Sequence, residues 1–160
     1  MGALKATVLT VSDRVSRGEA EDRSGPTAMD ALVELGFVVD LAVVSDGVES
    51  VEAALRGAVA AGAMLVVTTG GTGMARRDLT PEGTRRVIER EAPGLSEAIR
   101  NSTFGSNPHG MLSRGMSGVV AGTLIINLPG SVSGVIESLA VVGPALTHAV
   151  ELLSGSPSQH

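Results

Sequence analysis

The chain has 160 residues, 43% of them apolar and 18% charged, which suits a single domain with a sizeable core and excludes intrinsic disorder. Its formal net charge of −5 argues against a nucleic-acid partner, because such proteins need a basic surface that displaces counterions. The chain has no cysteine, which excludes disulfides and thiolate sites, and residues 1–14 resemble neither a signal peptide nor a membrane span, so we expect a cytoplasmic protein without membrane contact.

Apolar runs alternate with helical patterns along the chain. Short, β-branched runs are typical of buried strands, and they occupy residues 4–11, 37–44 and 63–69. Amphipathic or capped patterns that indicate helices lie between and after these runs, at residues 26–36, 48–62, 81–91 and 94–104. This alternation predicts a mainly parallel sheet with right-handed crossovers.

The C-terminal part continues the pattern in a different way. Residues 116–127 indicate two strands that meet at Ala121-Gly122, which predicts a β-hairpin. The chain looks helical from Ser131, and Pro144 is placed to open a last helix. We therefore predict an α/β fold, a three-layer sandwich whose sheet is flanked by helices, with one domain over residues 1–154 and a frayed tail over 155–160.

Polar clusters follow the predicted strands. Ser12-Asp13-Arg14, Ser45-Asp46-Gly47 and Thr68–Gly73 each come directly after an apolar run, and Asn127–Ser131 follows the last one. Because the carboxyl ends of parallel strands share one edge, where open α/β sheets bind ligands, these clusters can converge in one crevice. The alternative is that they are ordinary turns, which are naturally rich in Ser, Asp, Asn and Gly.

The glycine loop, Gly70-Gly71-Thr72-Gly73, is the most informative of these clusters. It matches neither the dinucleotide fingerprint G-x-G-x-x-G nor the Walker motif, since no Gly-Lys-Ser/Thr follows. Successive amides in such a loop form a concavity that binds anions, and the helix that opens near Pro81 adds the positive end of its dipole. The loop therefore predicts a phosphate-binding site, with the hydroxyl of Thr69 beside it.

Asp78 does not suit a receptor for anions, because its carboxylate would repel a phosphate. It suits a site in which a divalent cation lies between carboxylate and phosphates, since Mg²⁺ is typically held by one or two carboxylates together with substrate phosphates. The alternative is that Asp78 pairs with Arg76 or Arg77, or supports the start of the following helix. The residues alone leave both interpretations open.

A family resemblance rests on six motifs: "TVSDR", "TTGGTG", "RRDLTPE", "PGL", "LSRG" and "NLPGS". In this order they resemble the MogA/MoaB family of molybdenum cofactor biosynthesis proteins, whose relatives include the gephyrin G domain and the MoeA domain. The resemblance extends from about residue 5 to residue 153.

The resemblance implies a molybdopterin adenylyltransferase, which converts ATP and molybdopterin into adenylylated molybdopterin and pyrophosphate with the help of Mg²⁺. It implies that Asp46 and Asp78 are catalytic and bind the metal. The residues expected to bind the phosphates of ATP are Ser12, Asp13, Thr69, Gly70, Gly71, Thr72 and Gly73. Those expected to bind the pterin are Ser113, Arg114, Asn127, Pro129, Gly130 and Ser131.

The resemblance also implies a homotrimer or hexamer, with a MoeA-type insertion protein as a partner. The alternative function is that of a non-catalytic, MoaB-like protein that binds or assembles the pterin, because some MoaB proteins lack the key acids and do not adenylylate. This sequence keeps both acids, which favours the enzyme. Metal insertion of the MoeA type needs additional domains, for which 160 residues leave no room.

Overall fold

A computed structural model describes residues 2–155 of the chain, so most of the predicted tail, residues 156–160, lies outside the described residues. The strands are β1 (Leu4–Val11), β2 (Phe37–Val44), β3 (Leu65–Thr69), β4 (Arg90–Glu91), β5 (Ser117–Val120) and β6 (Thr123–Leu128). The helices are α1 (Asp13–Ser16), α2 (Ser24–Glu34), α3 (Val48–Ala60), α4 (Thr80–Arg85), α5 (Pro93–Asn101), the short 3₁₀ helix η1 (Pro108–Leu112) and α6 (Val132–Leu153).

The strands form one sheet in the order β2-β1-β3-β6-β5-β4. β2, β1, β3 and β6 run parallel to their neighbours, so their carboxyl ends lie at one edge. β5 returns antiparallel to β6, and the turn between them uses Ala121 and Gly122, both with positive φ. These features confirm the predicted α/β class, the mainly parallel sheet and the β-hairpin.

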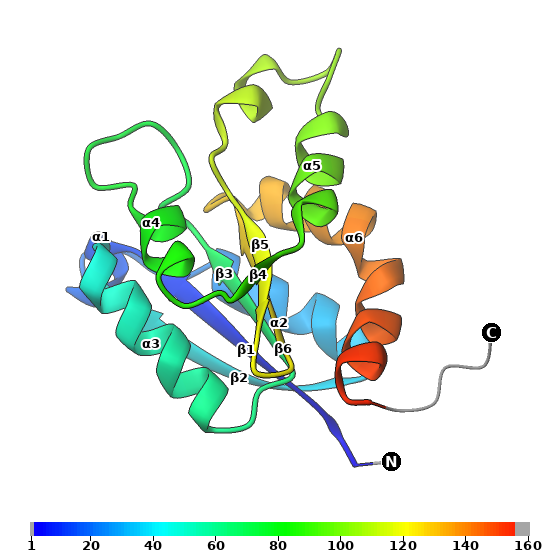
Figure 1. Cartoon of the computed structure of the whole chain (residues 1–160). Coiled ribbons are helices and arrows are strands. Elements are labelled where there is room, and N and C mark those ends of the chain that lie inside the picture. The colour runs from blue at the N-terminus through cyan, green and yellow to red at the C-terminus, as the bar shows by residue number, and fades with distance from the viewer. Residues whose placement is uncertain (1, 156–160) are drawn as a thin grey trace.

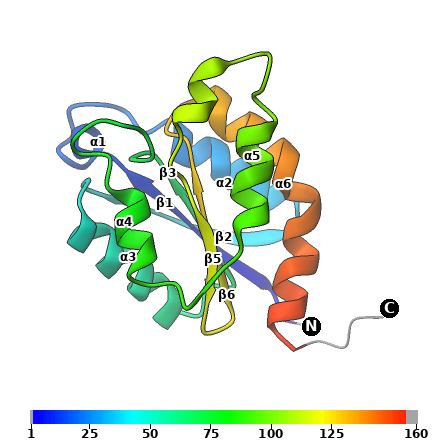
Figure 2. The same cartoon turned by 45° about the horizontal axis from the view of Figure 1, so that its top comes forward.

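Helices cover both faces of the sheet, which gives the predicted three layers (Figures 1 and 2). α2, α5 and α6 pack on one face, where a core cluster includes Val8, Leu32, Val67 and Leu146. α3 and α4 cover the other face, where the cluster around Leu55 includes residues of β1, β3 and β6. The sheet residues of the two clusters alternate along each strand, as the pleat of a sheet buried on both faces requires.

The prediction of a helix over residues 81–91 is wrong in its second half. α4 ends at Arg85, and Arg90–Glu91 form a short strand that pairs with β5. Backbone bonds from Glu89 to Val119 (2.9 Å) and from Ala92 to Ser117 (2.9 Å) extend this pairing. The unpaired edge of the β-hairpin thus offers hydrogen bonds that outweigh the helical propensity of the segment.

Pro144 does not open a helix but lies inside α6. Proline removes one backbone hydrogen bond from a helix, which normally kinks or ends it. Here Val142 and Leu146 are buried in the core on either side of the exposed proline, so packing keeps the helix continuous. α6 is long and apolar enough to cross a membrane, but its buried stripe packs on α2, α5 and β6, which makes it a core helix.

Candidate active site

The turns that follow β1, β2, β3 and β6 meet at the carboxyl edge of the sheet. Gly70, directly after β3, donates its N–H to Leu128 at the end of β6 (3.1 Å). Asp13, after β1, and Asp46, after β2, exchange backbone-to-carboxylate bonds: the Asp13 N–H donates to Asp46 Oδ2 (2.8 Å), and the Asp46 N–H donates to Asp13 Oδ1 (3.2 Å). The expected convergence of these four turns is therefore present.

The glycine loop has no room for a side chain at Gly70 or Gly71. Gly70 and Gly71 have φ values of 92° and 68°, in the region that favours glycine. A Cβ atom on Gly71 would lie 2.2 Å from the Thr80 hydroxyl oxygen, and one on Gly70 would lie 2.4 Å from the Val11 carbonyl oxygen. The Thr80 hydroxyl donates to the Gly70 carbonyl (2.9 Å), so this side chain holds the loop, and α4 has no side-chain capping bond at its start.

Both predicted catalytic aspartates border this loop. A Cβ atom on Gly71 would lie 3.1 Å from Asp46 Oδ1, and one on Gly73 would lie 2.8 Å from Asp78 Oδ2. The Asp78 carboxylate accepts the N–H of Ala75 (3.0 Å), which points it back towards the loop. Within residues 2–155, neither Asp46 nor Asp78 forms a salt bridge.

The neighbouring arginine has a different partner from the one considered in the sequence. Arg77 forms a two-pronged ion pair with Asp13, with both N–O distances at 3.0 Å, and also donates to the Asp46 carbonyl (2.9 Å). This hydrogen-bonded pair lowers the pKa of the Asp13 carboxyl. The structure therefore does not contain the ion pair between Asp78 and Arg77 that the sequence left open as an alternative.

The electrostatics of Asp46 favour a bound cation. Burial is the main cause that raises its pKa, and the nearby carboxylates of Asp13 and Asp78 raise it further. A divalent cation would relieve this repulsion. Among the described residues, no three His, Cys, Asp or Glu side chains cluster as a complete metal site. Two carboxylates without a third protein ligand fit Mg²⁺, which is commonly completed by water and substrate phosphates.

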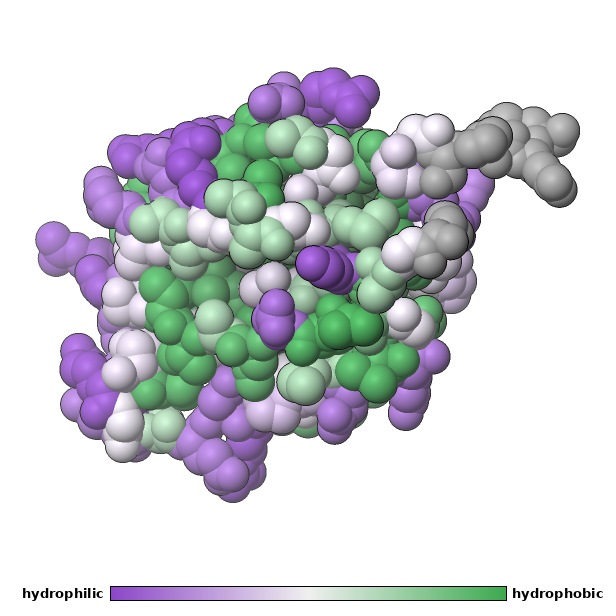
Figure 3. Space-filling model, turned by 90° about the horizontal axis from the view of Figure 1, so that it is seen from below, coloured by the Kyte–Doolittle hydropathy of each residue, from purple (hydrophilic) through white to green (hydrophobic). Residues whose placement is uncertain are grey.

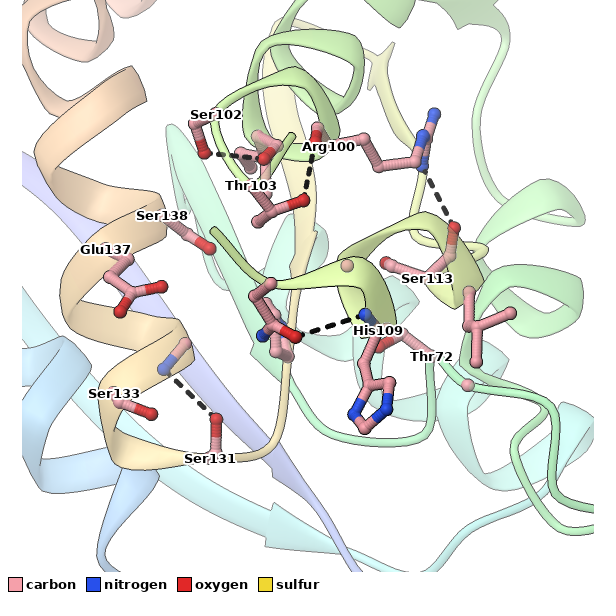
Figure 4. A pocket seen from close by; sticks show the side chains of 17 residues that line it. Thr72, Arg100, Ser102, Thr103, His109, Ser113, Ser131, Ser133, Glu137 and Ser138 are labelled. Carbon is pink, nitrogen blue, oxygen red and sulfur yellow. Dashed lines mark hydrogen bonds between the residues drawn. The ribbon is translucent and has the colours of Figure 1, made fainter. Parts of the chain in front are cut away.

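Two cavities open on either side of the glycine loop. Cavity A, of about 280 Å³, lies between the glycine loop, α5, η1 and the start of α6, and many hydroxyls face it (Figure 4). Cavity B, of about 300 Å³, lies between the end of β1, the start of α2 and the glycine loop. The turn Pro129–Ser131 borders both, because Pro129 and Ser131 line cavity A and Gly130 lines cavity B. The site thus has two cavities beside the glycine loop.

Most of the predicted binding residues line one cavity or the other, though not by predicted ligand, and Asp13 and Gly71 line neither. Those that line cavity A are Thr72, Gly73, Ser113, Pro129 and Ser131. Those that line cavity B are Ser12, Thr69, Gly70 and Gly130. Sequence reasoning missed several polar side chains of cavity A, namely Arg100, Ser102, Thr103, His109, Ser133, Glu137 and Ser138. The Ser/Gly-rich composition after residue 101 was the available signal, but it does not say which of these residues face a cavity.

Two predicted pterin-binding side chains lie outside both cavities. The Asn127 side chain is buried, with the residue 3% exposed, and its amide donates to the hydroxyls of Thr68 and Thr84 (both 3.0 Å) and accepts the Met116 N–H (3.1 Å). Arg114 lines a separate depression, and its guanidinium group is bonded to the protein itself. The prediction that these two side chains contact a ligand in cavity A or B finds no support in the structure.

Comparisons with known proteins place this fold in a family. Residues 7–148 match the family described as "Probable molybdopterin binding domain". A molybdopterin adenylyltransferase of Helicobacter pylori strain J99 is 38% identical over 99% of this chain and 93% of that protein. Gephyrin of Dictyostelium discoideum is 37% identical over 94% of this chain, which spans only 22% of gephyrin.

A solved structure agrees with the sequence matches. The molybdopterin biosynthesis enzyme MoaB from Thermus thermophilus superposes with a TM-score of 0.90 at 42% identity, covering 98% of this chain and 99% of that one. The fold and the sequence are thus similar over nearly the whole length of both chains. The chain belongs to the molybdopterin-binding domain family of molybdenum cofactor biosynthesis proteins, the MogA/MoaB family.

Proposed function

We propose that this protein transfers AMP from ATP to molybdopterin, which gives adenylylated molybdopterin and pyrophosphate. The observation that carries the proposal is that Asp46 and Asp78 both border the glycine loop, which itself lines two cavities. Similarity to a molybdopterin adenylyltransferase over 99% of the chain supports the same reaction. The product would pass to a MoeA-type insertion protein.

The chemistry needs little beyond alignment and charge neutralisation. A terminal phosphate oxygen of molybdopterin attacks the α-phosphorus of ATP in line, the bond from that phosphorus to the bridging oxygen breaks, and pyrophosphate leaves. Because the attacking oxygen is already an anion at neutral pH, no general base is required. Glycine-loop amides would hold and align the phosphates, the usual demand of such transfers.

Asp46 and Asp78 would hold Mg²⁺ in this proposal. When bound, the ion supplies positive charge that offsets the charge of the phosphates. The two residues contribute the ligands, and the Ala75 N–H orients the carboxylate of Asp78. Cavities A and B would receive the two substrates, with Ser113, Pro129 and Ser131 on the pterin side.

Replacing either acid tests the proposal. We expect Asp46→Asn and Asp78→Asn each to lower Mg²⁺-dependent pyrophosphate release by about a hundredfold or more, the typical effect of removing a preorganised electrostatic group. Asp40→Asn, on the outer strand β2, is the matched control and should leave the rate unchanged. Turnover of Asp78→Asn at the parental rate, with molybdopterin and ATP saturating, would contradict the proposal.

The alternative is a pterin-binding or assembly protein without catalysis. The family match, described only as a probable molybdopterin-binding domain, is the observation that favours it. The same assay separates the two functions, because a binding protein would retain molybdopterin but release no pyrophosphate.

We also propose that the protein is cytoplasmic and forms a homotrimer or hexamer. The apolar side chains exposed on the edge strand β2 support self-association.

A further inference from the structure

Arg114 connects parts of the site that are distant in sequence. Its backbone N–H donates to the Thr72 carbonyl (2.7 Å), and its Nε donates to the Gly73 carbonyl (2.8 Å). Its Nη2 donates to the Asp78 carbonyl, and its Nη1 forms an ion pair with Glu82 in the first turn of α4. One residue therefore holds both ends of the segment 73–78 and the helix that follows it.

This arrangement leaves the guanidinium little capacity for a ligand. An arginine side chain has five N–H donors, and the bonds to Gly73, Asp78 and both oxygens of Glu82 engage most of them. The side chain lines neither cavity A nor cavity B. Its ion pair with Glu82 also offsets the positive charge that would otherwise attract an anionic substrate.

Glu82 completes the arrangement from the other side. The hydrogen-bonded guanidinium of Arg114 lowers the pKa of the Glu82 carboxyl, so the pair is charged at neutral pH. The planar fork of an arginine suits a carboxylate and nearby carbonyl oxygens together, whereas a lysine ammonium would satisfy fewer of them. The "LSRG" and "TPE" motifs are thus joined by a physical contact between Arg114 and Glu82.

We propose that Arg114 and Glu82 are positioning residues, a clamp that fixes the segment 73–78 and thereby the carboxylate of Asp78. The kinetic part of this proposal rests on the proposed adenylyl transfer. Asp78 belongs to the metal side of the proposed site, so we expect loss of the clamp to weaken the use of ATP with Mg²⁺ more than the binding of the pterin. This assignment replaces the sequence-based expectation that Arg114 contacts the pterin.

Hydrogen exchange tests the clamp without any substrate. In Arg114→Gln, we expect the amides of Ala75 and Asp78, which are bonded within the segment, to exchange about tenfold faster or more, because charge-assisted bonds that hold it are lost. Amides of β3, such as that of Val67, are the internal control and should not change. Arg85→Gln, which removes an exposed ion pair of the same helix with Glu91, is the matched control variant.

Steady-state kinetics test what the clamp does. Arg114→Gln should lower kcat and raise the KM for ATP with Mg²⁺, together by about tenfold or more in kcat/KM, while the KM for molybdopterin stays within about twofold. Glu82→Gln should act in the same direction, and Arg114→Lys should restore part of the loss because it keeps the charge pair. If Arg114→Gln does not fold, Glu82→Gln and Arg114→Lys carry the same test.

The outcomes separate the two proposals. Unchanged exchange at Ala75 and Asp78 in a folded Arg114 variant overturns the clamp, and so does a rise confined to the KM for molybdopterin, which indicates direct contact with the pterin. A parental protein that releases no pyrophosphate contradicts the proposed function. The exchange experiment still decides the clamp in that case, because it needs neither substrate.

Discussion

Asp46 carries the least favourable charge of the site. Its carboxylate is partly buried and close to those of Asp13 and Asp78, and both effects raise its pKa. An aspartate must be ionised to bind a cation. As the pH falls, Asp46 therefore loses this ability at a higher pH than an ordinary aspartate does. Because the pKa of Asp46 is higher in the folded protein than in the unfolded chain, the ionised carboxylate lowers the free energy of unfolding at pH values above the unfolded-chain pKa. This cost disappears as the pH falls through the raised pKa and the folded protein is protonated.

Titration of the Asp46 carboxyl by ¹³C NMR checks this assignment on the metal-free protein. We expect its pKa to lie above the ordinary value of 3.8, and to decrease in Asp78→Asn because one like charge is removed. The decrease should be partial, since burial is the larger cause. A pKa at or below the ordinary value in the parental protein would contradict the environment that the structure gives Asp46, and a pKa that does not decrease in Asp78→Asn would show that the two carboxylates do not interact.

Single residues were predictable where their role depends on sequence neighbours. Asp46 and the glycines follow apolar strands directly, so the strand pattern alone assigned them to the sheet edge, whereas Asp78 was singled out by its place between the glycine loop and the next helix. Asn127 lies at the end of the last predicted strand and Arg114 was expected at the site through the family resemblance, yet both side chains bond inward, because the direction of a side chain depends on partners far along the chain. Glu82, which holds Arg114, gives no local signal beyond its place in the first turn of a helix.

The glycine loop is the element on which the proposed function depends most. Gly71→Ala would add backbone strain at positive φ and place a Cβ atom 2.2 Å from the Thr80 hydroxyl. We expect pyrophosphate release to fall by about a hundredfold or more, as for loss of a preorganised group. The strain of roughly 1–2 kcal/mol should also lower the Tm, by about 2–4 °C for each kcal/mol.

Gly62→Ala is the matched control for this change. Gly62 also has positive φ (86°), but a Cβ atom there would meet no other atom within 4 Å. It should therefore lower the Tm through strain and leave activity intact, as measured by differential scanning calorimetry beside the pyrophosphate assay. Equal activity in the Gly71 and Gly62 variants would mean that the loop does not approach a substrate closely.

Most elements were predictable because their hydrophobic period is unambiguous. The β-branched runs became β1, β2 and β3, and the Ala121-Gly122 turn formed the predicted hairpin. The prediction failed where tertiary contacts override local preference. Arg90–Glu91 pair with the free edge of β5, and Pro144 is tolerated because the neighbouring residues of α6 are buried.

At the scale of the molecule, one surface is suited to a partner. The edge strand β2 exposes Val38, Leu41 and Val43, and the face seen from below Figure 1, the side on which β2 lies, has a broad apolar area (Figure 3). An exposed apolar edge strand favours pairing with another chain. Light scattering on the parental protein should give the mass of a trimer or hexamer, and Leu41→Lys/Val43→Lys should lower it.

Met111→Lys is the control, because Met111 is an exposed apolar residue on η1, which lies at the opposite side of the molecule from that face (Figure 1). A monomeric mass for the parental protein would contradict the proposed assembly. An unchanged mass in the β2 double variant would move the interface to another face. The sequence predicted the oligomer only through the family resemblance, since exposure of β2 depends on its position at the sheet edge.

The sequence also predicted the convergence of four strand ends, because a parallel sheet brings them to one edge. It could not predict cavity A in full, because that cavity is formed where α5, η1 and the start of α6 come together around the glycine loop. Arg100 and Glu137, which line it, are separated in sequence and meet only through packing of the helices on the sheet.

The sharpest test of the proposed metal and phosphate site is a crystal structure with a non-hydrolysable ATP analogue and Mn²⁺, in which anomalous scattering locates the metal. We expect a metal peak within coordinating reach of both Asp46 and Asp78, with the nucleotide phosphates against Gly70–Gly73. A fully bound nucleotide whose phosphates lie away from this loop, or a metal that contacts neither aspartate, would contradict the proposed site.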